Sequence, residues 1–246
     1  MTETQWNAFS AFRKSFKTKT AEWSAFSELL VPLQKAALMD KTPEYPIETP
    51  VVYNRALDEI TPESDIRLLV IGDNPGKDEQ LSKNNKYLVG QAGKIGEGFF
   101  ARNPELGIDF RKNAIILNKT PVHSAKTAQL NYIQKNGGAE IRRLIEESQI
   151  WMAEHTAALL NALETAELWL VGYSELKEKG IFTPYKNALR SACKNSRAWE
   201  RVFVFQHFSM NRFTIDLDAF RRKNSGLSLV QSIHALGTLH KEELFR

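Results

Sequence analysis

Residues 67–76 read RLLVIGDNPG, an apolar run that ends in a turn-forming sequence. Three other runs share its character, and these are NAIILN at 113–118, ELWLVG at 167–172 and RVFVFQ at 201–206. Each run is short and continuously hydrophobic rather than alternating, which is typical of strands buried on both faces of a parallel sheet. The sequence therefore predicts four buried strands.

Helical patterns lie between and after these runs. They are GQAGKIGEGFFARN at 90–103, GGAEIRRLIEESQIWMAEHTAALLNALE at 137–164, TPYKNALRSACKN at 183–195 and SLVQSIHALGTLH at 228–240. Because strands and helices alternate along the chain, we predict an α/β three-layer sandwich with a central, mainly parallel four-stranded sheet.

The chain of 246 residues is long enough for one large domain with a substantial core, so we expect a single domain over 1–246. The first 45 or so residues read as a helical extension that packs on the sheet, and the proline-rich stretch after them reads as an extended linker. The sequence has no signal-peptide pattern and no long apolar run, so we expect a soluble, cytoplasmic protein, associated with the nucleoid if the source is bacterial. We expect a monomer with no membrane partner.

The single cysteine, Cys193, excludes an internal disulfide and a cluster held by four thiolates. The five histidines show no metal-ligand spacing, so we predict no metal and no cofactor. The net charge of +4 and the pI near 9.0 favour an anionic partner without requiring one.

Polar residues follow three of the four apolar runs. In a parallel sheet the carboxyl ends of the strands share one edge, and ligands bind there. We therefore expect these residues to line one cleft, and they are Asp73, Asn74, Asn118 and His207. After the remaining run, Gly172 and Ser174 are interpreted as a turn and a helix N-cap.

The stretch from Gly72 to Lys77 has some likeness to a phosphate-binding loop. That motif requires four residues between its glycines and a Ser or Thr after the lysine, whereas here three residues separate the glycines and Asp78 follows Lys77. The sequence therefore disfavours binding of a nucleoside triphosphate.

Five segments, in order, resemble the uracil-DNA glycosylase superfamily. VVYNRALDE at 51–59 and GDNPG at 72–76 are similar to the Tyr-Asn-Pro-Leu and Gly-Met-Asn-Pro-Gly segments of its single-strand-selective monofunctional members. YLVGQAG at 87–93 resembles the Pro-Phe-Val-Gly-x-Ala-Gly pocket segment of the iron–sulfur branch. NKTPV at 118–122 resembles Asn-x-Cys-Pro-Leu, and HFS at 207–209 resembles the His-Pro-Ser that begins the DNA-wedge loop.

The resemblance covers roughly residues 51–212 and shows three departures. Leu88 stands where the family has a stacking Phe, Phe208 stands where it has Pro, and the cysteines of the iron–sulfur branch are absent. The resemblance implies a DNA glycosylase that hydrolyses the N-glycosidic bond of uracil or a related damaged base flipped out of DNA, in base excision repair.

The resemblance also implies roles for individual residues. His207 would donate a hydrogen bond to O2 of the leaving base, Asn118 would read O4 and N3, and Asn74 would position the attacking water. Asp73 can accept the proton of that water, which an amide cannot do usefully. The remaining residues implied to contact the substrate are Gly72, Tyr87 and Leu88 for the base, with Phe99 as another candidate to stack on it, and Ser209, Met210 and Arg212 for DNA.

Each role has a structural alternative. Asp73 and Asn74 both favour turns, Asn118 could cap the following segment, and His207 could be a hydrogen-bonded histidine at a strand end. The aromatic rings could belong to the core.

A stripe of basic residues would share one face of a helix, and its members are Lys186, Arg190, Lys194 and Arg197. It is interpreted either as a solvated face or as a set of contacts to DNA phosphates. Two other functions stay open, namely a catalytically inactive nucleic-acid-binding protein on the same fold and a small-molecule nucleoside hydrolase or transferase.

Overall fold

The computed structural model describes residues 1–38 and 42–246. The described residues form a four-stranded sheet in the order β2-β1-β3-β4, in which every neighbouring pair is parallel. The strands are β1 (Leu68–Gly72), β2 (Ala114–Asn118), β3 (Glu167–Val171) and β4 (Val202–Phe205). All four lie within the predicted apolar runs, and β1, β2 and β4 are buried along their whole length.

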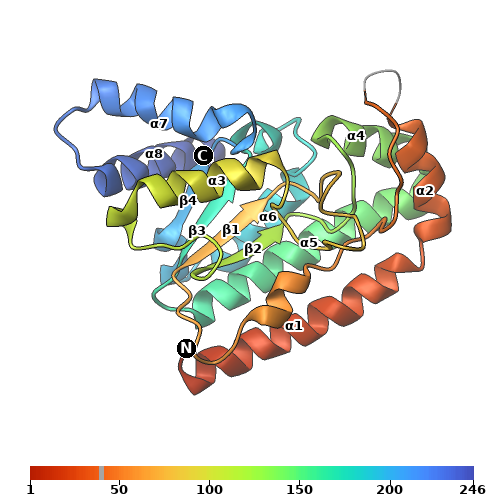
Figure 1. Cartoon of the computed structure of the whole chain (residues 1–246), viewed down its shortest axis with the longest axis horizontal. Coiled ribbons are helices and arrows are strands. Elements are labelled where there is room, and N and C mark those ends of the chain that lie inside the picture. Colours follow the sequence, from red (N-terminus) through yellow and green to blue (C-terminus); the bar gives the residue numbers. More distant parts are fainter. Residues whose placement is uncertain (39–41) are drawn as a thin grey trace.

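Helices cover both faces of the sheet (Figure 1). One layer contains α5 (Gly138–Ala162) and α6 (Thr183–Cys193), and the other contains α3 (Gln91–Arg102), α7 (Arg212–Lys223) and α8 (Leu229–Leu244). This is the predicted α/β three-layer sandwich. The helical patterns in the sequence correctly indicate α3, α5, α6 and α8, but they do not include α7 or the short helix α4 (Thr127–Asn136).

Aromatic side chains join the sheet to the layer that contains α3 and α7. The ring centroid of Trp169 on β3 lies 5.2 Å from that of Phe100 on α3 and 5.7 Å from that of Phe213 on α7. Ring pairs at these separations contribute about 0.5–1.5 kcal/mol beyond their buried area. They fix α7 against the sheet, and α7 in turn carries residues of the cleft described below.

The N-terminal helices are α1 (Glu3–Ser24) and α2 (Ser27–Ala36). The prediction that they pack on the sheet is wrong, because α5 lies between α1 and the sheet and α2 packs against α4 (Figure 1). The ring of Trp151 on α5 lies within 6.3 Å of the rings of Phe12, Phe16 and Trp23 on α1. These α1 residues recur at helical spacing, so they form one apolar stripe that α5 covers.

Residues 43–49 have no regular secondary structure, and they are fixed by hydrogen bonds rather than forming a free linker. The side-chain oxygen of the buried Gln80 accepts from the backbone N–H groups of Glu48 at 2.7 Å and Thr49 at 3.2 Å. Its amide nitrogen donates to the carbonyl of Pro46 at 2.9 Å. This segment therefore fastens the chain that follows the GDNPG turn.

Among the residues that the structure describes, no helix is both long and apolar enough to span a lipid bilayer.

Candidate active site

A cleft of about 570 Å³ lies at the carboxyl ends of β1, β3 and β4. It brings together two of the four residues that the strand ends predict for a shared cleft, Asp73 after β1 and His207 after β4. The other lining residues are Thr127, Gly172, Ser174, Glu175, Gln206, Ser209, Met210, Arg212, Ile215, Asp216 and Ala219. Three of these, Ser209, Met210 and Arg212, are the predicted DNA contacts.

Asp73 forms an ion pair with a fully buried lysine. The Nζ atom of Lys119 lies 2.5 Å from Oδ1 of Asp73, and the side chain of Lys119 is 0% exposed against 11% for Asp73. Burial lowers the pKa of Lys119, and the Asp73 carboxylate opposes this effect. Removing one partner of such a buried pair typically costs about 3–5 kcal/mol, because the other charge is left uncompensated.

Two glycines at strand ends make room for these polar side chains. Gly172 has a φ of +94°, and a Cβ atom there would lie 2.2 Å from Oδ1 of Asp73. A Cβ atom on Gly72 would lie 2.4 Å from Oδ1 of Asn118. Any larger residue at either position would displace the side chain of its neighbour. The predicted turn at Gly172 is confirmed, but the predicted N-cap at Ser174 is wrong, because Gly172 is the N-cap of the short 3-10 helix Tyr173–Leu176 and Ser174 lies inside it.

The hydrogen bonds of His207 define its tautomer. The backbone N–H of Ser209 donates to Nδ1 of His207 at 3.1 Å, and the hydroxyl of Ser209 lies 2.9 Å from the same atom. Because Nδ1 accepts, the proton of the neutral ring is on Nε2. Burial lowers the pKa of His207, Asp73 raises it and Lys119 lowers it. The ring is therefore a neutral donor through Nε2 near pH 7.

The residues after His207 form an anchored loop with an exposed tip. Phe208 is fully buried, with its ring 5.2 Å from that of Phe213 and 6.0 Å from that of Phe110. Met210 and Asn211 both have left-handed backbone angles, with φ of 53° and 57°, and Met210 is 75% exposed. Left-handed residues other than glycine are uncommon, and successive ones hold this apolar side chain out beside the cleft.

Asn74 does not line the cleft. Its amide nitrogen donates to the carbonyl of Ser124 at 3.0 Å and to the hydroxyl of Ser124 at 2.9 Å. The Oγ1 atom of Thr127 lies 3.3 Å from Oδ2 of Asp73 and 3.5 Å from Oδ1 of Asn74. Of the two polar neighbours in the turn, Asp73 faces the cleft and Asn74 ties the turn to the loop after β2.

Asn118 lies at the end of β2, beside Gly72, and is only 1% exposed. Its Nδ2 atom has no hydrogen-bond partner, and neither has Oε2 of the buried Glu79. Burial raises the pKa of Glu79 to about 7, and the backbone at Gly76 and Leu88 and the amide of Asn118 oppose that rise. The amide of Asn118 therefore lies close to the buried carboxyl group of Glu79.

The residues predicted to contact the base from 87–99 are in the core. Tyr87 is 0% exposed, and its hydroxyl donates to the carbonyl of Val52 at 2.6 Å. Leu88 is 3% exposed with a φ of 52°, and its carbonyl accepts from Arg111 at 2.6 Å. The ring of Phe99 packs 4.9 Å from that of Phe213. The rings of Tyr87 and Phe99 therefore belong to the core, which was the structural alternative for them.

The basic stripe is shorter than predicted, because α6 ends at Cys193 and therefore excludes Lys194 and Arg197. The Nζ atom of Lys186 lies 3.5 Å from the carbonyl oxygen of Leu244 at the end of α8. The guanidinium of Arg190 lies 4.6 Å from the centre of the Trp199 ring. Both basic groups thus have partners within the protein.

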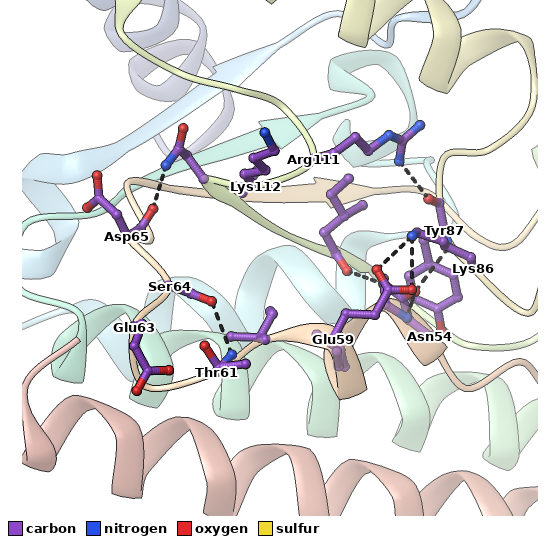
Figure 2. A pocket seen from close by; sticks show the side chains of 16 residues that line it. Asn54, Glu59, Thr61, Glu63, Ser64, Asp65, Lys86, Tyr87, Arg111 and Lys112 are labelled. Atoms are coloured by element: carbon purple, nitrogen blue, oxygen red, sulfur yellow. Dashed lines mark hydrogen bonds and ion pairs between the residues drawn. The ribbon is translucent and has the colours of Figure 1, made fainter.

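A second cavity, of about 440 Å³, lies beside the edge strand β2 (Figure 2). Two of its charged residues, Lys86 and Glu59, form an ion pair at 3.0 Å. Asn54 is part of its wall. Its amide nitrogen donates to the carbonyl of Ile116 at 2.8 Å, and its amide oxygen accepts from the backbone N–H of Tyr87 at 3.2 Å. Tyr87 is the one predicted site residue among its lining residues, so the cleft is the stronger candidate.

Sequence reasoning did not identify the polar cleft residues Thr127, Glu175, Gln206 and Asp216, nor the buried Lys119 and Glu79, which lie outside the cleft lining. Lys119 carried a usable signal, because a charged residue directly after a buried strand is rarely placed there without a partner. Burial raises the pKa of Glu175, as does the Asp73 carboxylate, whereas Lys119 opposes the rise. Thr127 and Glu175 lie in the segments after β2 and β3 and show no signal that distinguishes them from ordinary polar residues.

Within residues 1–38 and 42–246, no group of three or more His, Cys, Asp or Glu side chains is arranged to hold a metal ion. Comparison of the chain with models of known families, with curated proteins and with solved structures finds no match.

Proposed function

We propose that the protein is a DNA glycosylase that removes uracil or a related damaged base from DNA. The observation that carries the proposal is the cleft at the carboxyl ends of the strands, where a carboxylate, Asp73, and a neutral histidine, His207, occur together. A base-releasing hydrolase needs a group that accepts a proton from water and a donor that stabilises the departing base anion. These two residues supply both.

The proposed reaction exchanges one bond at C1′ of the sugar and transfers one proton from water to Asp73. The water oxygen bonds to C1′ of the sugar, and the C1′–N bond breaks with its electron pair leaving on the base. Asp73 accepts the proton that the water loses, and His207 donates a hydrogen bond from Nε2 to the base anion without giving up its proton. The negative carboxylate also stabilises the positive charge that develops on the sugar in the transition state.

The target base must leave the duplex stack before it can enter the cleft, which costs a few kcal/mol and least for an unpaired or mispaired base. Met210 is placed to fill the space that the base leaves, because it is exposed, apolar and fixed by the anchored loop. Arg212 lines the same cleft and can contact a phosphate.

The base-reading role is assigned to Asn118, whose unpartnered Nδ2 atom can donate to a base carbonyl. Because Asn118 is 1% exposed, this contact requires the covering residues to move when the base binds. Asn74 acts indirectly in this proposal, since its amide is bonded to Ser124 and holds the turn that carries Asp73.

The test is the release of uracil from an oligonucleotide that contains one uracil, as a single strand and as a duplex, detected by cleavage of the abasic product with alkali. We expect activity without added metal and in the presence of a chelator. Activity that a chelator abolishes would contradict the metal-independent mechanism.

Two further arms separate the other functions. Binding of the oligonucleotide without base release would identify an inactive nucleic-acid-binding protein. Hydrolysis of free deoxyuridine, with no action on the oligonucleotide, would identify a nucleoside hydrolase. Either result would replace the proposed function.

A further inference from the structure

The ammonium of Lys119 has a complete set of acceptors inside the protein. Its Nζ atom lies 2.5 Å from Oδ1 of Asp73, 2.5 Å from the carbonyl oxygen of Val171 and 3.3 Å from that of Gly72. An ammonium has three protons to donate, and three acceptors are present. The ring of Phe182 adds a cation–π contact at 4.9 Å.

This arrangement connects three strand ends at one point. Lys119 follows β2, Gly72 ends β1 and precedes Asp73, and Val171 ends β3. The backbone N–H of Lys119 also lies 3.0 Å from the carbonyl oxygens of both Gly72 and Asp73. The lysine is thus fixed by its backbone and by its side chain, and Asp73 is the acidic group that it holds.

A nucleophilic role does not suit this lysine. A lysine that attacks C1′ of the sugar has to reach the cleft as a free amine. Lys119 is 0% exposed, does not line the cleft, and directs its ammonium to three protein oxygens. Its chemistry is therefore exerted through Asp73.

We propose that Lys119 is a positioning residue that fixes the Asp73 carboxylate for the attack of water. This inference rests on the proposed function. Lys119 holds Oδ1 on the protein side, whereas Oδ2 lies beside Thr127, a residue that lines the cleft. Oδ2 is then the oxygen that accepts a hydrogen bond from the water.

The charged groups around Asp73 explain why a cation is needed. Glu175, from the segment after β3, is a second carboxylate close enough for the two to repel, and it lines the same cleft. His207, from the segment after β4, is neutral, and Thr127 from α4 carries no charge. The ammonium of Lys119, 2.5 Å from Oδ1 of Asp73, offsets the repulsion between the two carboxylates.

The test is a double-mutant cycle of Lys119→Met and Asp73→Asn, measured by single-turnover cleavage of the uracil oligonucleotide over a range of pH. We expect Lys119→Met to slow cleavage about ten- to hundredfold at pH 7, the range for a misplaced catalytic group, with little change in DNA affinity. In the Asp73→Asn background, Lys119→Met should cause no further loss, because the lysine acts through that carboxylate.

The matched control is Lys86→Met, which breaks the ion pair with Glu59 beside the second cavity and should leave the cleavage rate unchanged. If Lys119→Met does not fold, the double variant Lys119→Met/Asp73→Asn, which carries neither charge, is compared with Asp73→Asn alone. A further loss of rate in the double variant would overturn the inference.

Treatment with borohydride during the reaction provides a second test. We expect no covalent protein–DNA product, and a product that Lys119→Met eliminates would show that the lysine is a nucleophile instead. The wild-type protein distinguishes the two levels of failure. Without wild-type cleavage the proposed function fails, whereas wild-type cleavage that Lys119→Met leaves unaltered overturns only the inference.

Discussion

The tautomer of His207 is set by a single backbone group, the N–H of Ser209. With Nδ1 occupied as an acceptor and the pKa of the ring lowered by burial, the neutral ring can only donate from Nε2. A neutral donor suits a base anion because it stabilises the developing charge without requiring a proton transfer. A charged imidazolium is not needed for this role.

His207→Ala should therefore lower the single-turnover rate of uracil release by roughly two to four orders of magnitude, the range for losing a key electrostatic group. DNA affinity should change little. The matched control is His234→Ala. Nε2 of His234 lies 2.7 Å from Oε1 of Glu167, at the end of the sheet opposite to the cleft, so this change should not affect the rate. A His207→Ala rate close to that of the wild type would remove His207 from the site.

At the scale of elements, a buried histidine, His123, forms a hydrogen bond with the backbone of the GDNPG turn. Nδ1 of His123 lies 2.8 Å from the carbonyl of Pro75, which can only accept, so this nitrogen carries the proton. Nε2 then accepts from the hydroxyl of Tyr45 at 2.8 Å. Burial lowers the pKa of His123 to about 4, so the ring is neutral in the folded protein.

This histidine predicts a pH dependence of stability. Above pH 6.5 the ring is neutral in both the folded and unfolded states, and its contribution is fully present. As the pH falls from about 6.5 to about 4, the unfolded chain binds a proton that the folded protein does not, so stability is lost. The difference between a pKa of 6.5 in the unfolded chain and about 4 in the folded protein corresponds to about 3 kcal/mol.

We expect the difference in unfolding free energy between the wild type and His123→Gln to shrink by about that amount across this window, because the variant lacks the titrating ring. Denaturant unfolding at pH 7.5, 5.5 and 4.5 measures it. A difference that is independent of pH would mean that His123 does not stay neutral when folded.

The elements also show what local sequence can and cannot predict. The four strands were predictable because continuous apolar runs report burial on both faces without knowledge of their neighbours. Helix α7 was not, because it buries little more than Phe213 and Leu217 on an otherwise polar surface. Local sequence does not indicate which strands lie side by side. The contacts of Lys119 with Asp73 and Val171 depend on this order, because β1 lies between β2 and β3.

The same limit applies to the candidate site. The shared edge of the sheet predicted that Asp73 and His207 would meet, since that follows from parallel strands alone. Which way Asn74 points, and whether Tyr87 and Leu88 face the cleft or the core, depends on backbone angles in the loops. The φ of 52° at Leu88 and the hydrogen bonds from Asn74 to Ser124 are set by tertiary contacts that leave no local pattern.

At the scale of the whole molecule, the net charge of +4 matters only where the cations are free to contact DNA. Arg212 lines the cleft, and the last turn of α7 carries three further basic residues. Lys186 and Arg190 on α6 contact the end of α8 and the ring of Trp199 instead. We therefore expect DNA to follow the cleft and α7 rather than α6.

Salt dependence of binding distinguishes these two surfaces, because each lysine or arginine that contacts a phosphate contributes about 0.7 to 0.9 to the slope of log K against log salt. Arg212→Gln should lower the slope by about one unit on a uracil-free oligonucleotide, since it removes one contact. The double variant Lys186→Gln/Arg190→Gln removes two charges but should leave the slope unchanged. The ammonium of Lys186 contacts the carbonyl of Leu244, and the guanidinium of Arg190 contacts the ring of Trp199. The opposite pattern, a loss of about two units in the α6 variant and none in Arg212→Gln, would place the DNA across α6 and separate DNA binding from the cleft.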